Sequence, residues 1–376
     1  MILTIDASNI RAGGGITHLK NILNYADPER HDVTKVIVYG GQNPLKYLPK
    51  KSWLDLREIP LLNKSFLRRL HWQQTEIVKF ANKSSDLLLF PGGFYIGSFR
   101  PYVAMFQNMQ IFEAKERNRE SGKEWFRLKM LQLAQCRTFQ NASGLICPSE
   151  YALNYLTKYH PKLVHKKPLQ LIPHGAVKLQ ETLACKEKIS DLPLRILYVS
   201  TVKNYKHQWN LIDAVGCLRK EGTSIELHLV GGGDPKAICR MRESIQRNDP
   251  EQKLIYYHGN LPQEETLEWY QKADIFVFPS TCETFGISLL EAMSAGLPIA
   301  SSDRGPLPEV LKDAGLYFNP ESVLSIKICL QHMIENPRLQ QKLAIKAQQY
   351  SEQYSWKKCA NETFSFLRDV YEENKK

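Results

Sequence analysis

Short apolar runs with the β-branched and aromatic content of buried strands alternate with helical patterns along most of the chain. The helical patterns include 124–137 and 208–219. Strands that alternate with helices indicate parallel sheets covered on both faces. The pattern therefore predicts an α/β protein with two doubly wound, Rossmann-like domains. The strands are expected at 2–6, 35–39, 86–90, 102–106, 144–147 and 169–172 in the first half, and at 195–199, 226–230, 253–257, 274–278, 298–301 and 316–318 in the second.

The boundary between the two halves is expected just after Pro173-His174-Gly175, where a strand ends and a polar segment of little pattern follows as far as residue 191. This predicts a first domain over 1–175 and a second over 176–355. A chain of 376 residues is long enough for two sizeable cores. Doubly wound domains bind ligands beyond the carboxyl ends of their strands, so two of them facing each other would hold a ligand in the cleft between them.

The strongest local signal is residues 279–298, PSTCETFGISLLEAMSAGLP, which follow the apolar strand expected at 274–278. Ser280, Thr281 or Thr284 is expected to cap a helix that stops near Gly296 and Pro298. The first backbone N–H groups of a helix lack intrahelical partners and point the same way. Strand, turn and helix together therefore predict an anion site.

Glu283 and Glu291 bracket this turn, one at its mouth and the other about a turn into the helix. That spacing places them near opposite ends of a phosphate-linked ligand. A carboxylate beside a phosphate is electrostatically unfavourable, so we expect the two glutamates to bind hydroxyl groups. A sugar and a ribose are the obvious sources of such hydroxyls.

The whole segment resembles the paired-glutamate signature of the retaining nucleotide-sugar glycosyltransferases of family 4, which have the GT-B fold. The resemblance implies that Glu283 contacts the donor sugar and Glu291 the ribose. It implies that the backbone after Glu283 holds the diphosphate, and that a last helix at 356–371 returns to the first domain. An ordinary strand–helix unit with two surface glutamates is the alternative. The residues implied for the diphosphate are Thr284, Phe285, Gly286 and Ile287.

A second motif, YVSTVKNYKHQ at 198–208, opens the second domain. Family members usually have Gly-Arg after this strand and Lys-Asn further on, and their Arg and Lys clamp the diphosphate. Lys206 matches the lysine, but Ser200 and Thr201 stand at the Gly-Arg positions and His207 replaces the Asn. An always-charged, bidentate group is thereby lost, and a threonine cannot supply it. Candidates to compensate are Lys203 and Arg304.

Glycine-rich turns follow several of the expected strands. Gly13-Gly14-Gly15 is not a G-x-G-x-x-G motif, which argues against a nicotinamide cofactor. Glycine lets the backbone approach a ligand closely. The resemblance implies that Gly14 and Gly15 lie under the donor phosphate, and that Gly231, His258 and Gly259 lie near the nucleotide base.

Gln107 and Asn108 follow the strand at 102–106, where relatives often carry a histidine aimed at the donor sugar. Neutral hydrogen bonding would replace an imidazole here, and Asn108 is the candidate catalytic residue beside Glu283 and Lys206. A helix N-terminus and a lysine stabilise the charge on a departing diphosphate more in the transition state than before it. The resemblance implies retention of anomeric configuration. No D-x-D pair occurs in the chain, so we infer neither a metal nor a cofactor besides the donor.

The net charge of +11 is concentrated in the first half, where residues 1–175 hold 25 Lys+Arg and 13 Asp+Glu. Such a field attracts phospholipid head groups, lipid pyrophosphates or nucleic acid. The segments 67–80 and 123–133 mix aromatic and basic residues and are candidates for a membrane interface, or else for amphipathic helices packed on the sheet. The chain starts directly with a strand pattern, and its eight cysteines are scattered. We therefore expect a cytoplasmic protein, peripheral on the inner face of the plasma membrane.

The favoured interpretation is a metal-independent, retaining hexosyltransferase. It would move a sugar from a nucleoside-diphosphate sugar to a glycan or a polyprenyl-diphosphate-linked acceptor, in the synthesis of a surface polysaccharide, lipopolysaccharide or glycolipid. No nucleic-acid partner is expected. Two alternatives stay open: a nucleotide-sugar epimerase of the same fold, and a noncatalytic nucleotide-binding partner protein, which the threonine at position 201 keeps in play.

Overall fold

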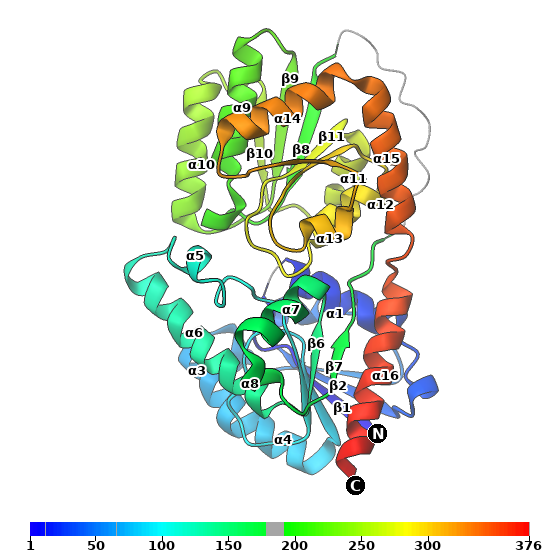
Figure 1. Cartoon of the computed structure of the whole chain (residues 1–376). Coiled ribbons are helices and arrows are strands. Elements are labelled where there is room, and N and C mark those ends of the chain that lie inside the picture. Colours follow the sequence, from blue (N-terminus) through cyan, green and yellow to red (C-terminus); the bar gives the residue numbers. More distant parts are fainter. Residues whose placement is uncertain (12, 65, 178–191, 376) are drawn as a thin grey trace. The chain divides into compact units, whose positions relative to one another are not determined.

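The computed structural model describes residues 1–11, 13–64, 66–177 and 192–375, and it divides into two compact units (Figure 1). The first unit comprises Met1–Gly175 together with Ser355–Lys376, and the second comprises Ala176–Tyr354. Each unit has a single parallel sheet with helices on both faces. The two doubly wound parallel sheets predicted from the sequence are thus confirmed.

The sheet of the first unit has the strand order β3-β2-β1-β4-β5-β6-β7, with every neighbouring pair parallel. Its central strands are almost entirely buried, because helices cover both faces. The chain winds outward from β1 in one direction and from β4 in the other. The strands are β1 Ile2–Asp6, β2 Lys35–Gly40, β3 Leu54–Glu58, β4 Leu87–Phe90, β5 Tyr102–Met105, β6 Gly144–Cys147 and β7 Leu169–Leu171.

The last helix of the chain, α16, belongs to the first unit, where it packs against α1. Gly144, the first residue of β6, allows α16 to pack closely on the sheet as well, because a Cβ there would lie 2.8 Å from Cγ2 of Val370. The helices of this unit are α1 Gly14–Tyr25, α2 Gln42–Leu45, α3 Phe66–His71, α4 Ile77–Ser84, α5 Ala114–Arg117, α6 Gly122–Asn141, α7 Glu150–Tyr159, α8 Pro161–Val164 and α16 Trp356–Lys375, with a π-helical segment at Trp72–Glu76.

The second unit repeats the same winding with the strand order β10-β9-β8-β11-β12-β13. Its strands are β8 Leu194–Val199, β9 Ile225–Val230, β10 Ile255–Gly259, β11 Ile275–Phe278, β12 Ile299–Ser302 and β13 Leu316–Phe318. Its helices are α9 Gln208–Lys220, α10 Pro235–Asn248, α11 Gln263–Lys272, α12 Ile287–Ser294, α13 Leu307–Leu311, α14 Val323–Glu335 and α15 Pro337–Ser351.

Local signals in the sequence explain where several of these helices begin. The Asp234 carboxylate accepts from the backbone N–H groups of Lys236 and Ala237 at 3.0 and 3.2 Å, and Pro235 occupies the first turn of α10. Ser322 caps α14 in the same way. Such caps satisfy backbone donors that have no intrahelical acceptor.

The sequence pattern missed one strand and misplaced another. β3 has the sequence LDLRE, whose charged residues hide the strand pattern, and its position at the edge of the sheet allows the charged side chains to reach solvent. β10 was expected at 253–257 but runs over Ile255–Gly259. His258 and Gly259 therefore lie within the strand and not in a turn after it, which corrects the expectation for that turn.

Gly231 is required by the packing of the second unit. Its φ is 131°, and a Cβ at this position would lie 2.1 Å from the carbonyl oxygen of Ser200. We expect Gly231→Ala to destabilise the protein by ~2 kcal/mol or more, because both backbone strain and a clash are introduced. Thermal or urea unfolding measures the loss. Gly232→Ala is the matched control: its nearest contact would be 3.4 Å from the Asn260 Cβ, so equal losses would contradict this explanation.

Candidate active site

The strand order of the second unit reverses between β8 and β11, which are hydrogen-bonded neighbours. Parallel strands all end at the same edge of a sheet, and the point where the winding reverses leaves a crevice between the loops that follow the two strands. Lys206 lies in the loop after β8, and Glu283 lies in the loop after β11. The topology therefore brings together two residues that are 77 positions apart in the sequence.

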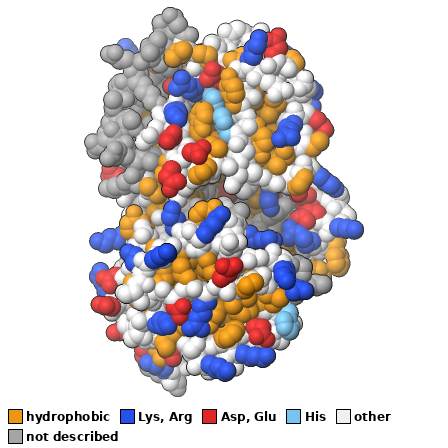
Figure 2. Space-filling model, turned by 180° about the vertical axis from the view of Figure 1, so that it is seen from behind, with side chains coloured by type: hydrophobic (Ala, Val, Ile, Leu, Met, Phe, Trp, Pro, Cys, Tyr) orange, Lys and Arg blue, Asp and Glu red, His pale blue; other side chains and the backbone are white. Residues whose placement is uncertain are grey.

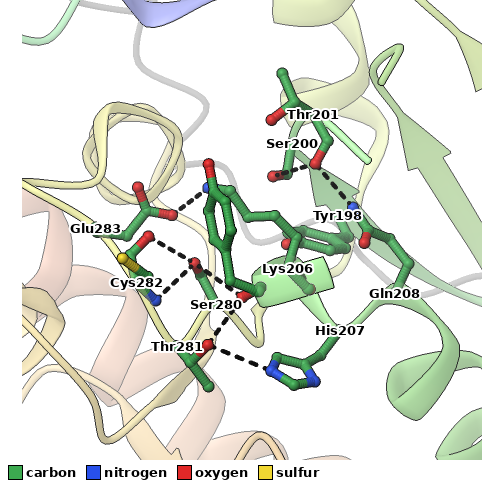
Figure 3. Close-up of polar contacts among 11 residues, drawn as sticks. Tyr198, Ser200, Thr201, Lys206, His207, Gln208, Ser280, Thr281, Cys282 and Glu283 are labelled. Atoms are coloured by element: carbon green, nitrogen blue, oxygen red, sulfur yellow. Dashed lines mark hydrogen bonds and ion pairs between the residues drawn. The ribbon is translucent and has the colours of Figure 1, made fainter. Parts of the chain in front are cut away.

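Hydrogen bonds fix the two loops to each other, as Figure 3 shows. The backbone N–H and the hydroxyl of Thr281 both donate to the carbonyl oxygen of Tyr205, at 2.9 and 3.2 Å. The Tyr198 hydroxyl donates to the carbonyl oxygen of Lys206 at 2.9 Å, and Nε2 of His207 lies 3.3 Å from the Thr281 hydroxyl. These contacts hold the backbone on either side of the Lys206 side chain.

The central contact of the site is an ion pair between Nζ of Lys206 and Oε1 of Glu283 (Figure 3). The two side chains are only 9% and 16% exposed, so each charge depends on the other for compensation. Nζ also lies 5.3 Å from the ring centroids of both Tyr205 and Phe278, a favourable position for a cation. A diphosphate that takes Lys206 as its partner competes with this carboxylate for the ammonium group.

His207, which stands where the family usually has asparagine, adopts a left-handed conformation with φ 50°. Asparagine and histidine are both enriched in this region of backbone space, so the replacement keeps the turn intact. His207 lies directly before α9 and is buried. The departure from the family pattern at this position therefore preserves the local geometry that presents Lys206.

The helix α12 begins at Ile287, directly after Gly286 with φ 104°. The expectation that Ser280, Thr281 or Thr284 is the N-cap of this helix is wrong, because its N-cap residue is Gly286. The Ser280 and Thr281 hydroxyls instead hold loop carbonyls. A glycine at the N-cap has no side chain to accept from the first backbone N–H groups of α12, which suits a helix start that binds an anion.

The Phe285 side chain is buried and packs edge-on against Tyr354, with ring centroids 5.6 Å apart. Only its backbone can therefore take part in binding, as expected from the sequence. Ile287 begins α12, and Gly286 cannot easily carry a side chain, since a Cβ there would lie 3.0 Å from Leu307. The residues predicted for the diphosphate thus form one continuous stretch at the start of α12.

Glu291 lies a turn into α12, as predicted, and is partly buried. The hydroxyl of Tyr270, on α11, donates to its Oε2 at 2.9 Å. Burial raises the pKa of the Glu291 carboxyl to about 7, although the hydrogen bond from Tyr270 acts in the opposite direction. The sequence contains no signal for this tyrosine, because its role depends on how α11 packs beside α12.

Ser200 and Thr201, which replace the family's Gly-Arg, lie at the end of β8 beside the glycine run after β9. The carbonyl oxygen of Thr201 accepts from the Ser200 hydroxyl at 3.1 Å and from Nε2 of Gln208 at 3.0 Å. Thr201 is exposed and has only a short hydroxyl to offer. Arg304, a candidate to compensate, lies after β12 with its Nε 3.2 Å from Asp303.

His258 belongs to an aromatic cluster on one face of the second sheet. Its Nε2 lies 3.1 Å from Nδ1 of His228, and both imidazoles pack against Trp269. Burial lowers the pKa of both imidazoles, which keeps them neutral at pH 7. Gly259 has a φ of 68°, and a Cβ built on it would have nothing within 4 Å. The backbone there is therefore open to a ligand.

In the first unit, the winding reverses between β1 and β4, and glycines follow both strands. Gly14 and Gly15 are the first two residues of α1, so the helix begins within the glycine run and not after it. A Cβ built on Gly15 would lie 3.8 Å from Oε1 of Gln107, and a Cβ built on Gly92 would lie 3.3 Å from the same atom. Gln107 therefore occupies the space left by these two glycines, whereas the catalytic role expected for Asn108, the next residue, stays a prediction.

A buried polar network at the end of β1 was not predicted from the sequence. The Asp6 carboxylate is 1% exposed and accepts from the Ser8 backbone and hydroxyl at 2.9 and 3.0 Å, and from Nε2 of Gln73 at 3.2 Å. Burial raises the pKa of Asp6 while the Ser8 hydrogen bonds oppose this. Gln73 lies in the π-helical segment, a feature frequent at functional sites. The only sequence signal is a polar D-A-S directly after an apolar strand.

The described residues contain one group with metal-ligating atoms, formed by His18, His174 and Cys359 in the core of the first unit. The Nδ1 atoms of the two imidazoles are 3.0 Å apart and share a hydrogen bond. Burial lowers the pKa of His174 to about 4 and raises that of Cys359 to about 12, so both are neutral at pH 7. The group includes none of the predicted site residues.

Residues 180–350 match the family model described as glycosyl transferases group 1. The chain is 29% identical over 169 residues to the O-antigen chain mannosyltransferase B of Escherichia coli, which covers 45% of this chain and 44% of that protein. It is 27% identical over 192 residues to the alpha-monoglucosyldiacylglycerol synthase of Streptococcus pneumoniae. That match covers 47% of this chain and 42% of the synthase. The chain thus matches less than half the length of these curated relatives.

Solved structures match over the whole chain. Sucrose-phosphate synthase from Thermosynechococcus elongatus has a TM-score of 0.77 at 17% identity, with 99% of this chain and 100% of that one covered. WaaG, a glycosyltransferase involved in lipopolysaccharide biosynthesis, has a TM-score of 0.72 at 16% identity, with 98% and 99% covered. HepE of Anabaena, solved with UDP and glucose, has a TM-score of 0.68 at 15% identity, with 97% and 98% covered.

The chain therefore has the GT-B fold, and residues 180–350, which make up most of its second unit, match the group 1 glycosyltransferase model. The resemblance to glycosyltransferases of the surface-polysaccharide and glycolipid type is confirmed. The matched residues include Lys206, Glu283 and Glu291, so the candidate site lies within the part of the chain that the family model covers.

The raised pKa of Glu291 predicts a pH-dependent cost to stability. The carboxyl is easier to protonate in the folded protein than in the unfolded chain, so the folded state loses stability as the pH rises from about 4.5 to about 7 and no more above that. Glu291→Gln removes the ionisation. The difference in unfolding free energy between this variant and the wild type should therefore be ~1–3 kcal/mol more favourable to the variant at pH 8 than at pH 5. Thermal unfolding at both pH values measures this, and a pH-independent effect would contradict the raised pKa.

Proposed function

We propose that the protein is a glycosyltransferase that moves a sugar from a nucleoside-diphosphate sugar to a glycan or lipid-linked acceptor in polysaccharide or glycolipid biosynthesis. The observation that carries the proposal is the buried Lys206–Glu283 pair beside the uncapped N-terminus of α12. This arrangement offers one cation, several backbone donors and one carboxylate at a single point. These are the groups that a sugar diphosphate requires.

The chemistry follows from the order in which charge develops. When the bond between the anomeric carbon and the diphosphate breaks, negative charge grows on the leaving oxygens. Lys206 and the N-terminal N–H groups of α12 are held in place by the loop contacts, so they stabilise this charge without first having to reorganise. Glu283, released from Lys206 by the diphosphate, is free to accept hydrogen bonds from the donor sugar's hydroxyls. Glu291 is assigned to the ribose.

The finer features of the reaction belong to the same proposal. We propose retention of anomeric configuration, by attack on the same face as the leaving phosphate. The two-carboxylate chemistry of a glycosidase would need an acid and a nucleophile on either side of the bond, whereas Glu291 is assigned to the ribose. We propose that no metal is required, because the chain has no D-x-D pair and because Lys206 supplies the positive charge. The transferred sugar is proposed to be a hexose.

The acceptor is proposed to bind the first unit, at the point between β1 and β4 where Gly15, Gly92 and Gln107 meet. Relatives that act on O-antigen chains and on diacylglycerol lipids support an acceptor carried by a lipid or a glycan. No helix in the described part of the chain is long and apolar enough to span a bilayer. We propose a cytoplasmic protein that contacts an anionic membrane through the first unit.

Replacing Lys206 with alanine should reduce kcat/KM by roughly a hundredfold, because one preorganised charge partner of the leaving diphosphate is lost. Steady-state kinetics with the preferred donor checks this. Lys272→Ala is the matched control, since Lys272 forms an exposed ion pair with Glu268 at 2.9 Å on α11 of the same unit. A change below about threefold for Lys206→Ala would show that another residue holds the phosphate.

Replacing Glu283 with glutamine should separate binding from turnover. The neutral amide no longer competes with the diphosphate for Lys206, so UDP or GDP should bind at least as tightly as to the wild type. Turnover should fall by about a hundredfold or more, because the sugar loses its charged acceptor. Isothermal titration and kinetics measure the two quantities. Nucleotide affinity that drops in parallel with turnover would argue against the assigned division of roles.

The proposed activity is tested by incubating the protein with a panel of UDP-, GDP- and dTDP-sugars and a membrane extract, followed by mass spectrometry of the products. A mass increase of one hexose on a lipid or glycan is the expected result, and NMR of the product linkage should show the anomeric configuration of the donor. EDTA should leave the rate unchanged. Interconverted free nucleotide sugar without an acceptor would instead identify an epimerase, and donor binding without turnover a noncatalytic protein.

A further inference from the structure

The helix α6 carries an outward-facing apolar stripe. Phe126, Met130 and Leu133 are 62%, 50% and 64% exposed, and their spacing of four and three residues places them on one face of the helix. Trp125, at 38% exposed, lies beside them. The opposite face, with Leu128 and other buried residues, packs on the first unit. An ordinary amphipathic helix would present polar residues where this stripe lies.

Basic residues surround the stripe. Lys123 and Arg137 are exposed on the same side, and Nζ of Lys129 lies 5.7 Å from the Trp125 ring. The single acidic residue of α6, Glu124, is neutralised by Arg127, whose Nε donates to it at 2.7 Å. Figure 2 shows that basic and hydrophobic side chains intermingle over the surface of the first unit in the lower half of the view. The stripe therefore lies in a field of positive charge.

The other segment expected to meet a membrane, 67–80, does not present such a face. Trp72 is 1% exposed and Ile77 is fully buried, so both belong to the core. Phe80 stacks on Tyr39, with ring centroids 5.4 Å apart and planes inclined by 24°. Of the two alternatives expected for this segment, the structure supports packing on the sheet, because its aromatic residues pack the π-helical segment and α4 onto that sheet.

The stripe is too small for a stable protein interface. It offers four large apolar side chains, whereas a stable protein–protein interface takes about 20–30 residues a side. A helix that lies on a bilayer needs only a short apolar face, with aromatic residues at the head-group level and lysines or arginines along its sides. Several basic residues near the surface add attraction for anionic lipids.

We propose that α6 docks the first unit on a bilayer that contains anionic phospholipid, with the side chains of Phe126, Met130 and Leu133 inserted among the acyl chains. Lys123, Lys129 and Arg137 contact the lipid phosphates. The inference rests on the proposed function for its biological sense, since a lipid-linked acceptor lies at such a surface. It rests on the exposure and charge of α6 for its physical basis.

Vesicle flotation tests the proposal with the full chain. Wild type should float with vesicles of phosphatidylcholine and phosphatidylglycerol at low salt, float much less with phosphatidylcholine alone, and lose binding at 0.5 M salt as the charges are screened. Phe126→Ser, Met130→Ser and Leu133→Ser together should reduce binding at least tenfold. The matched control is Leu324→Ser with Ile328→Ser on α14, which are 63% and 56% exposed in the other unit. That variant should float like the wild type.

Trp125 provides a second readout that needs no label. Trp72, Trp209 and Trp356 are buried and Trp53 and Trp269 are half-buried, which leaves Trp125 as the exposed tryptophan. A blue shift of the emission on adding anionic vesicles should therefore disappear in Trp125→Phe. Equal flotation of the triple variant and the wild type, or equal flotation with neutral and anionic vesicles, would overturn the proposal.

The outcome is separable from that of the proposed function. The triple variant should keep the wild-type affinity for UDP, because none of its three residues is among those assigned to the donor, and Lys206, Glu283 and Glu291 are in the second unit. Vesicle binding through the stripe by a protein that transfers no sugar would support the docking surface and contradict the proposed activity. Sugar transfer without any vesicle binding would support the activity and contradict the docking surface.

Discussion

The functional part of this molecule depends on one constraint of parallel sheets, which is that all strands end at the same edge. In the second unit the chain winds outward from β8 in one direction and from β11 in the other, so the loops after these two strands diverge and leave their ends uncovered. Lys206, Glu283 and the start of α12 all lie at this edge. The first unit repeats the arrangement at β1 and β4, where glycines leave room around Gln107.

The fold was predictable because its strands are apolar on both faces and therefore visible as short apolar runs. The prediction failed for strands that are not uniformly apolar. β3 was missed because it has charged residues, as an edge strand can. β10 was predicted two residues too early because its tyrosines and histidine hide where the strand begins and ends. The aromatic residues of 67–80 looked like an interface because sequence alone cannot show which face of a helix is covered. Only the burial of Trp72 decides this.

The candidate site was predictable as a set of residues and not as a set of contacts. Lys206 and Glu283 were assigned to separate parts of one ligand, but the structure shows them paired with each other across 77 residues of sequence. No local pattern reports a contact of that range. The Tyr270 hydrogen bond to Glu291 has the same origin, since it links two helices. The expected caps at Ser280 and Thr281 failed because those two hydroxyls donate to carbonyl oxygens of the loops around Lys206.

The pairing also bears on the missing arginine. A site with two free cations would attract any polyphosphate, whereas here the one lysine is already neutralised and a ligand must offer more than negative charge to displace the carboxylate. A sugar diphosphate does so, because its hydroxyls give the released Glu283 new hydrogen-bond donors in place of Lys206. Inorganic diphosphate would leave that carboxylate unpaired in a low-dielectric site. If the site binds the donor as proposed, a threonine at position 201 would give the diphosphate alone one charge partner fewer, and binding would then depend on the whole donor.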